Sequence, residues 1–168
     1  MADIIKIGVS SKELKQRAER AARARRFEAV DFTPACPNFY VRYWLPKING
    51  SFSEYFSDAE AMARGQILGQ KWVLEHVQSD LVFNPLSVDF QNAREAGSLG
   101  CDVKYPENNV IWVGDGWVHN EHDLAVLRRI DPLSSGLQGK AVQFAEQMRG
   151  LADRYIVRLA DGEELRPA

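Results

Sequence analysis

The chain has 168 residues, 45% apolar and 26% charged, a balance that predicts one globular domain with a buried core and excludes extensive disorder. The formal net charge of −2 supplies no overall field to attract nucleic acid or anionic lipid, so we expect neither nucleic acid nor a membrane as a partner. The sequence has only two cysteines and shows neither an apolar leader nor an apolar run of membrane-spanning length. This combination predicts a reducing, cytoplasmic setting.

A basic helix is predicted over about residues 12–26. Leu14 and a series of alanines form a thin apolar stripe along it, and a serine precedes it as a cap. Seven lysine and arginine side chains on this helix offer a surface for an anionic partner. Glu13 and Glu19 interrupt that surface, so we interpret it as a solvated face.

The next segment combines aromatic residues with prolines, which predicts a short strand after residue 31 followed by an irregular stretch. Amide, phenol and guanidinium groups occur together there, and they form a candidate substrate wall. The competing interpretation is that the aromatic side chains of this stretch are packing residues. The candidate substrate-binding residues of the stretch are Asn38, Tyr40 and Arg42.

A longer helix is predicted over residues 57–76, because Ser57 and Glu60 form a capping box before an apolar pattern of helical period. Residues 80–83 are then apolar and predict a short strand. Polar side chains follow the strand, and Asn84 and Asp89 are the candidate binding residues among them. Asp89 has a second possible role, as the N-cap of a helix that follows it.

The remaining pattern predicts two short strands joined by a turn at residues 106–109, then a helix opened by Asn120. His119 and His122 lie at the start of that helix, and we interpret them as exposed helix-start residues and not as metal ligands. A last amphipathic helix is expected from residue 134 or 136 to residue 153. A strand at residues 155–159 follows it, with no partner expected further along the sequence.

Residues 80–132 join a strand, a crossover and a second strand-helix unit, an order typical of a β/α barrel. A complete (β/α)8 barrel needs about 250 residues, so the chain predicts an α/β fold that is a partial TIM barrel. We expect a single incomplete domain over residues 1–168, with an N-terminal segment and helix in residues 1–30 and β/α units in residues 31–168. Uncovered sheet and helix surfaces predict a homo-oligomer or a complex with a second polypeptide.

Five sequence stretches occur in an order that resembles the N-terminal part of the uroporphyrinogen decarboxylase superfamily. The resemblance extends from Ser11 to Tyr155, and it implies the N-terminal half of a (β/α)8 barrel. The superfamily includes porphyrinogen decarboxylases and zinc-dependent methyltransferases that move methyl groups between a small substrate, a corrinoid protein and an acceptor. The stretches are VDFTPACP, YWLPKINGSFSEYFSDAEAMARGQ, SDLVF, AGSLGCDVKYPENNV and EHDLAVLRRIDP.

The methyltransferase and O-demethylase branch is the better match. The arginine-rich decarboxylase signature, of the form RQAGRYLPEY, is replaced here by residues 36–44. In the methyltransferase branch the zinc ligands, a His-x-Cys pair and a later Cys, belong to the C-terminal half of the barrel. The resemblance therefore implies that zinc and corrinoid belong to a partner chain or a corrinoid protein, and that this chain binds no metal itself. Its own contribution would be substrate walls formed by Asn38, Tyr40, Arg42, Asn84 and Asp89.

Three functions stay open at this point. The chain is half of a split methyltransferase that is inactive alone, or a non-catalytic module that pairs with itself or with a full-length barrel, or a uroporphyrinogen decarboxylase-like lyase. The second possibility relies on a strand edge expected to be exposed after Leu159. The sequence does not specify the methyl donor in the first.

Overall fold

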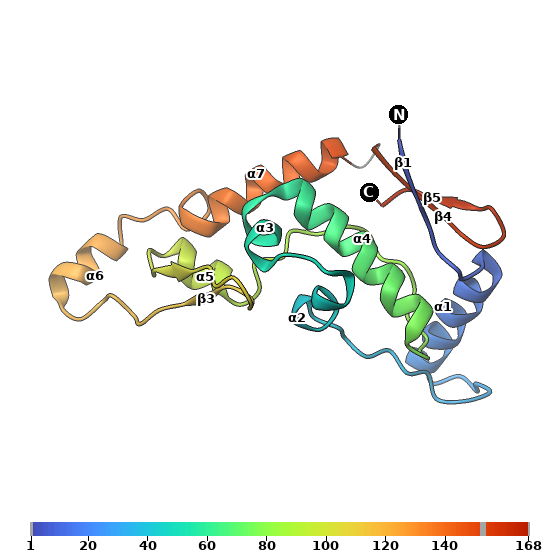
Figure 1. Ribbon diagram of the computed structural model, residues 1–168. Coiled ribbons are helices and arrows are strands. Elements are labelled where there is room, and N and C mark those ends of the chain that lie inside the picture. Colours follow the sequence, from blue (N-terminus) through green and yellow to red (C-terminus); the bar gives the residue numbers. More distant parts are fainter. Residues whose placement is uncertain (1, 152–153, 168) are drawn as a thin grey trace. The chain divides into compact units, whose positions relative to one another are not determined.

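A computed structural model describes residues 2–151 and 154–167 of the chain (Figure 1). The fold is mixed α/β, and the chain divides into two compact units. The first unit contains residues Met1–Asn49, Arg64–Leu86 and Leu151–Ala168, and the second contains Gly50–Ala63 and Ser87–Gly150. Each unit is therefore assembled from segments that are distant in sequence.

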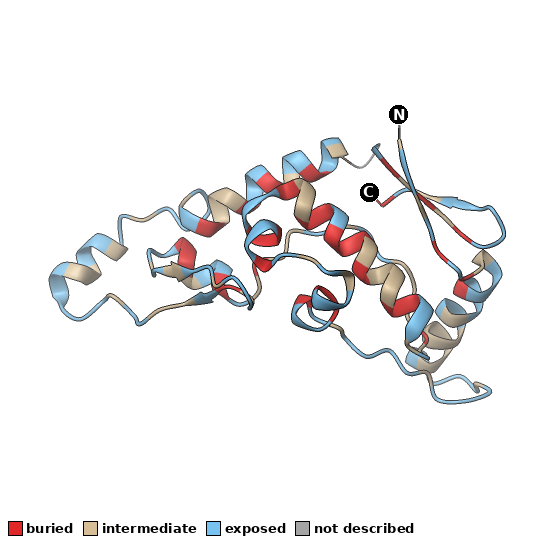
Figure 2. Ribbon diagram, viewed as in Figure 1, coloured by how far each residue is buried: buried red, intermediate tan, exposed pale blue. Residues whose placement is uncertain are grey.

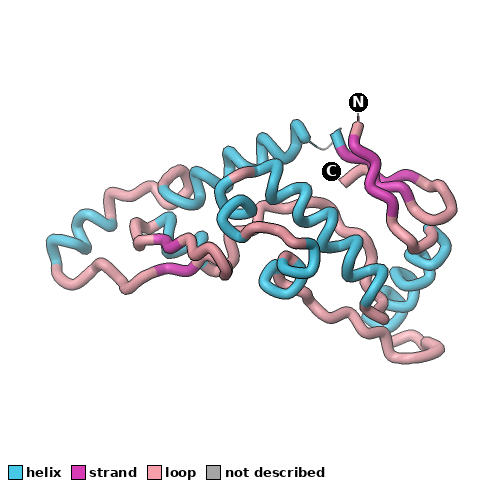
Figure 3. The backbone as a smooth tube through the Cα atoms, viewed as in Figure 1, coloured by secondary structure: helices cyan, strands magenta, loops and turns pink. Residues whose placement is uncertain are grey.

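The first unit combines strands with helices (Figure 3). Its elements are β1 (Asp3–Lys6), α1 (Ser11–Arg25), α2 (Val41–Trp44), the 3-10 helix η1 (Pro46–Ile48), most of α4 (Ala59–His76), β4 (Tyr155–Arg158) and β5 (Glu164–Leu165). The second unit is mainly helical. Its elements are α3 (Phe52–Ser57), the first turn of α4, α5 (Ala93–Ser98), β2 (Val103–Lys104), β3 (Trp112–Val113), α6 (Glu121–Leu127) and α7 (Gly136–Leu151).

The sheet of the first unit has the strand order β1-β4-β5. β1 and β4 are parallel, with Asp3 opposite Tyr155 and Lys6 opposite Arg158. β5 is antiparallel to β4. The predicted strand beginning at Tyr155 is confirmed, but the expectation that it lacks a later partner is wrong, because the chain turns through Gly162 (φ +86°) and pairs back as β5. The edge expected to be free after Leu159 is thus occupied.

The core of the first unit lies between this sheet and helices α1 and α4 (Figure 2). Along and just after β4, alternate residues are buried, as expected when one face of a sheet packs on a core. Ile67 and Leu74 lie two turns apart on one face of α4, and Leu14 is the buried residue of α1. The buried core residues are Ile7, Val9, Leu14, Ile67, Leu74, Tyr155, Val157 and Leu159.

The second unit is organised around one face of α7. The spacing of its buried residues, four then three then four, is the helical period expected for that segment. Phe144 contacts Phe90 with a ring-centroid separation of 5.1 Å. The predicted amphipathic helix is confirmed over residues 136–151, while residues 152 and 153 lie outside the described residues. The buried residues of α7 are Leu137, Ala141, Phe144 and Met148.

Two predicted helix caps are confirmed, and the cap of a third predicted helix lies one residue later than expected. The Ser10 hydroxyl accepts a hydrogen bond from the Glu13 amide at the start of α1, and Asn120 caps α6 in the same way. The helix expected over residues 57–76 is confirmed as α4, but its cap is Asp58 and not Ser57. α3 ends at Ser57, and Asp58, whose Oδ1 accepts from the Ala61 amide at 2.6 Å, begins α4.

Two predicted strands do not form. Residues 31–36 and 80–83 are irregular, although the two segments are joined by a hydrogen bond from the Asp80 amide to the Ala35 carbonyl at 2.7 Å. Further along, the Leu86 amide donates to the Pro167 carbonyl at 3.0 Å. In these segments the sequence predicted strands with regular hydrogen-bond ladders. Isolated hydrogen bonds satisfy some of the backbone groups instead. The predicted pair around residues 106–109 is confirmed as the antiparallel strands β2 and β3.

None of the helices in the described part of the chain has both the length and the apolar character needed to cross a bilayer.

Candidate functional site

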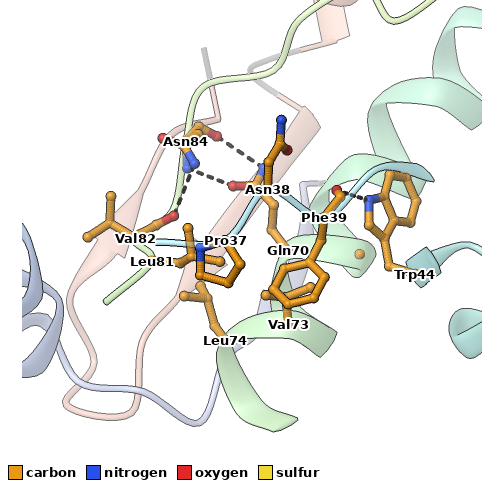
Figure 4. Close-up of a pocket in the computed structure, with 11 residues that line it drawn as sticks. Pro37, Asn38, Phe39, Trp44, Gln70, Val73, Leu74, Leu81, Val82 and Asn84 are labelled. Atoms are coloured by element: carbon orange, nitrogen blue, oxygen red, sulfur yellow. Dashed lines mark hydrogen bonds between the residues drawn. The ribbon is translucent and has the colours of Figure 1, made fainter. Parts of the chain in front are cut away.

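A cavity of about 110 Å³ in the first unit is the candidate binding site (Figure 4). It lies between the segment before α2, the middle of α4 and the irregular residues after α4. Its walls are mainly apolar and aromatic, with three side-chain amides. The lining residues are Pro37, Asn38, Phe39, Trp44, Gly69, Gln70, Val73, Leu74, Leu81, Val82 and Asn84.

Trp44 forms one wall of this cavity and is held from two directions. Its indole Nε1 donates to the Phe39 carbonyl at 3.1 Å. Its ring lies against Gly69 of α4, where an added Cβ would overlap the indole. The absence of a side chain at position 69 therefore allows the indole to approach the helix backbone, and Trp44 is only 6% exposed.

Gln70 holds the opposite wall in place through hydrogen bonds to the backbone of Asn84. Its Oε1 accepts from the Asn84 amide at 2.6 Å, and its Nε2 donates to the Asn84 carbonyl at 3.1 Å. One side-chain amide thus occupies both main-chain groups of Asn84, as a neighbouring strand would. The Asn84 side chain in turn donates to the Val82 carbonyl at 3.2 Å (Figure 4). This arrangement holds the irregular residues 81–84 beside α4.

The chemistry of the cavity is uncharged, because none of its lining residues carries an ionisable side chain. Gln70 and Asn84 are already hydrogen bonded, whereas Asn38 is exposed at the rim. Pockets for drug-sized ligands usually enclose about 300–1,000 Å³. The cavity therefore suits a small neutral compound, or the neutral end of a larger one, with a hydrogen-bonding group directed at Asn38.

The five predicted binding residues do not all meet at this site. Asn38 and Asn84 line the cavity. Tyr40 and Arg42 are exposed at the start of α2 and do not line it. Asp89 belongs to the second unit. The structure thus brings together two of the five residues, from two segments that were proposed separately.

Gln70 is the wall residue that the sequence reasoning missed. A signal for it existed, because position 70 lies three residues after Ile67 and four before Leu74 on the apolar face of a predicted helix. A polar side chain on such a face needs a partner. Gly69 carried a weaker signal of the same kind, as a glycine inside a helix where it costs about 1 kcal/mol relative to alanine.

Asp89 is occupied by contacts within its own unit. Its Oδ2 accepts from the hydroxyl of Tyr55 at 3.1 Å, and its Oδ1 accepts from the Gln91 amide at 3.1 Å and from the Gln91 side chain. Gln91 has a left-handed backbone, with φ of 51°. The interpretation of Asp89 as the N-cap of the following helix is wrong, because α5 begins at Ala93 and Asn92 occupies its N-cap position.

A second hollow, of about 380 Å³, lies beside α1 and is charged. The cations that line it are already neutralised. Arg20 pairs with Asp80 and, at 2.8 Å, with Asp31, and the hydrogen bond from Arg20 lowers the pKa of Asp31. Arg17 pairs with Glu13 at 2.5 Å. The side chains of Arg17 and Arg20 are only 12% and 18% exposed, and both are already paired, so they offer little to an anionic ligand.

The described residues do not fit a zinc site. Within residues 2–151 and 154–167, no three His, Cys, Asp or Glu side chains are grouped so that they could hold a metal ion. Cys36 is exposed, and its thiol approaches the Asp80 carbonyl at 3.8 Å. His119 and His122 are exposed beside the α6 N-terminus. No chemical step can therefore be derived through a metal on these residues.

No family model, curated protein or solved structure matches this chain. The family resemblance of the sequence thus stays a prediction, and function is argued from the cavity and its surroundings.

Proposed function

We propose that this chain supplies substrate-binding walls to a corrinoid-dependent methyltransferase of the O-demethylase type. In this proposal it is the N-terminal half of a (β/α)8 barrel, and a partner polypeptide completes the barrel and holds the zinc. The observation that supports the proposal is the uncharged cavity, which brings Asn38 and Asn84 together although they lie in distant segments. A small methyl-bearing substrate needs apolar contact and one or two directing hydrogen bonds, and this wall provides both.

The role of these residues is to bind and orient. Trp44 and the aliphatic side chains offer apolar contact, and the Asn38 amide at the rim can both donate and accept a hydrogen bond. Gln70 keeps the Asn84 wall in place. The zinc and the corrinoid, which supply the methyl-transfer chemistry, are assigned to the partner, and the chain alone is expected to be inactive.

A binding or regulatory module is the second candidate, and the sheet favours it. β1 pairs with β4 on one side, and in the described residues no strand pairs with its other side. Free backbone groups on such an edge can accept a strand from a second copy or from another barrel protein. The decarboxylase-like alternative has less support, because a porphyrinogen carries several carboxylates and no cation lines the cavity.

The cavity can be tested by NMR with side-chain amide signals as reporters. Small neutral methyl ethers, thioethers and methylamides would be titrated into the labelled chain, with carboxylated analogues of each in parallel. We expect the neutral compounds to shift the amide signals of Asn38 and Gln70, and the carboxylates to shift them less, because an unpaired charge is costly in an uncharged cavity.

Two variants make the test specific. Asn38→Ala removes the rim amide and is expected to weaken binding about tenfold without changing the fold, which corresponds to one lost hydrogen bond. Gln143→Ala, an exposed amide on α7 in the other unit, is the matched control and should bind as the parent does. The proposal is abandoned if no neutral compound shifts the two signals, or if both variants bind equally.

A further inference from the structure

Asn49 has an unusual backbone for a residue that carries a side chain. Its φ of 55° and ψ of 35° lie in the left-handed region, at the C-cap of the 3-10 helix η1, where its amide donates to the Pro46 carbonyl at 3.2 Å. Asparagine is one of the few side-chain-bearing residues that visit this region often. Gly50 follows directly, and no other asparagine of the sequence is followed by glycine.

The polar groups of this Asn-Gly pair are not held by other residues. Within the part of the chain that the structure describes, neither the Asn49 side chain nor the Gly50 amide makes a hydrogen bond. By contrast, the Asn84 side chain donates to the Val82 carbonyl, and the Asn120 side chain caps α6. Asn49 is also exposed to solvent. The peptide group between residues 49 and 50 can therefore turn without losing a hydrogen bond, and water reaches it.

The geometry of an asparagine places its own side chain within reach of the next backbone nitrogen. Bond formation between that nitrogen and the side-chain carbonyl carbon closes a five-membered ring. A side chain on the following residue crowds this approach and restricts the backbone rotation that it needs. Gly50 has no Cβ and a permissive backbone, so both obstacles are absent at Asn49.

We propose that Asn49 is a site of spontaneous covalent modification, where its side-chain amide becomes a carboxylate through a cyclic imide formed with Gly50. The Gly50 nitrogen gives up its proton to solvent base and bonds to Cγ of Asn49, while the side-chain nitrogen takes up a proton and leaves as ammonia. Water then adds to one imide carbonyl, and the C–N bond at that carbon breaks. Opening at Cγ gives aspartate, whereas opening at the main-chain carbonyl gives isoaspartate. Water is the only co-reactant.

The modification changes both charge and chain length at this point. Either product adds one negative charge to a chain whose formal net charge is −2. Isoaspartate also adds one carbon to the main chain between η1 and α3, just before Ser51, whose hydroxyl caps α3 by accepting from the Glu54 amide at 3.2 Å. Asn49 does not line the candidate cavity, so this inference is independent of the methyltransferase proposal.

Ageing of the whole chain tests the site. The native protein would be incubated at mildly alkaline pH, and the conversion of each asparagine would be quantified by peptide mass spectrometry. Asn108 is the reference, because it is also exposed but is followed by Asn109 and not by glycine. We expect Asn49 to convert several-fold faster than Asn108, and at a rate close to its own rate in urea, since no hydrogen bond restrains it. A protease that cleaves before aspartate but not before isoaspartate would show that both products form.

Two glycine variants make the test specific. Gly50→Ala places a methyl group beside the attacking nitrogen and should slow the conversion of Asn49 several-fold. Gly116→Ala is the matched control, because nothing lies within 4 Å of a Cβ there, and it should leave the rate unchanged.

Three results would overturn the proposal. The first is a conversion of Asn49 in the native parent protein that is no faster than that of Asn108, a comparison that does not depend on the folding of any variant. The second is formation of aspartate without isoaspartate, which indicates direct hydrolysis of the side chain. The third is equal conversion of Asn49 in the Gly50→Ala and Gly116→Ala proteins.

Discussion

The guanidinium of Arg20 on α1 is paired with the buried carboxylate of Asp80, which follows α4. Asp80 is only 5% exposed, and its second oxygen accepts from the Ala35 amide at 2.9 Å. One carboxylate thus joins three segments of the first unit: α1, the irregular residues before α2 and the residues after α4. Since these last two segments carry two walls of the cavity, the pair supports the candidate site.

Asp80→Asn should destabilise the first unit strongly. Replacing one partner of a buried pair leaves the other without compensation, and losses on the order of 3 kcal/mol are typical. Urea unfolding followed by circular dichroism would measure the loss. Asp31→Asn is the matched control, because Asp31 also pairs with Arg20 but its side chain is 64% exposed, and its loss should be much smaller. Equal losses of unfolding free energy in the two variants would refute the inference that the buried Asp80 stabilises the unit more than the exposed Asp31 does.

Gly69→Ala should deform the cavity. The new methyl group would overlap the Trp44 indole, and overpacking of this kind costs about 1–3 kcal/mol. The expected result is a lower unfolding midpoint with altered tryptophan fluorescence. Gly150→Ala provides the comparison, since nothing lies within 4 Å of a Cβ there and alanine favours a helix. A Gly69→Ala protein as stable as Gly150→Ala would show that Trp44 does not depend on this glycine.

Asp89→Ala separates a structural role from a binding role. The Tyr55 hydroxyl, on a side chain only 1% exposed, would lose its acceptor, as would the Gln91 amide. We expect a stability loss of about 1–3 kcal/mol with ligand binding at the cavity unchanged. Thermal unfolding and the NMR titration report the two properties separately. Unchanged stability with weakened binding would instead support the original prediction that Asp89 binds substrate.

Asp161 should contribute to acid sensitivity. The Ser11 amide and hydroxyl donate to its Oδ2 at 2.9 and 2.8 Å, and these bonds lower the pKa of Asp161. A lowered native pKa stabilises the fold above the ordinary aspartate value of about 3.9, and this contribution is lost as pH falls through the native pKa.

Unfolding midpoints measured from about pH 7 down to about pH 3 check this expectation. Asp161→Asn should give a shallower decline in stability at the acid end, because asparagine does not titrate. Ser11→Ala, which removes the hydroxyl donor, should reduce the same dependence in part. Parallel curves for all three proteins would mean that the contacts of Asp161 do not contribute to acid unfolding.

Local signals in the sequence predicted much of the helical structure. α1, α6 and α7 follow from apolar periodicity and from Ser10 and Asn120 as caps, because these features act within a few residues. The turn that joins β2 and β3 is local in the same sense. The two short strands predicted on either side of this turn could not have been bounded more closely from the sequence, since the end of a strand is set by its partner.

Pairing between distant segments could not be predicted from the sequence. β1 has only four residues, and its partner β4 begins at Tyr155, so no local pattern indicated the pair. Residues 80–83 have a strand composition, but a strand needs a neighbour, and the neighbour of Asn84 proved to be the side chain of Gln70. For the same reason the sequence indicated Asn38 and Asn84 as separate candidate residues. It did not indicate that they line one cavity, because residues of α4 complete that cavity.

The pairing of β1 with β4 also constrains how the protein can fold during synthesis. Asp3 to Lys6 must wait for residues 155–158 to leave the ribosome before the parallel pair β1-β4 can form. The segments of the second unit, which end at Gly150, are complete earlier. Until then the apolar side chains that pack on the sheet, Ile67 and Leu74 among them, lack the strand residues that cover them in the complete fold.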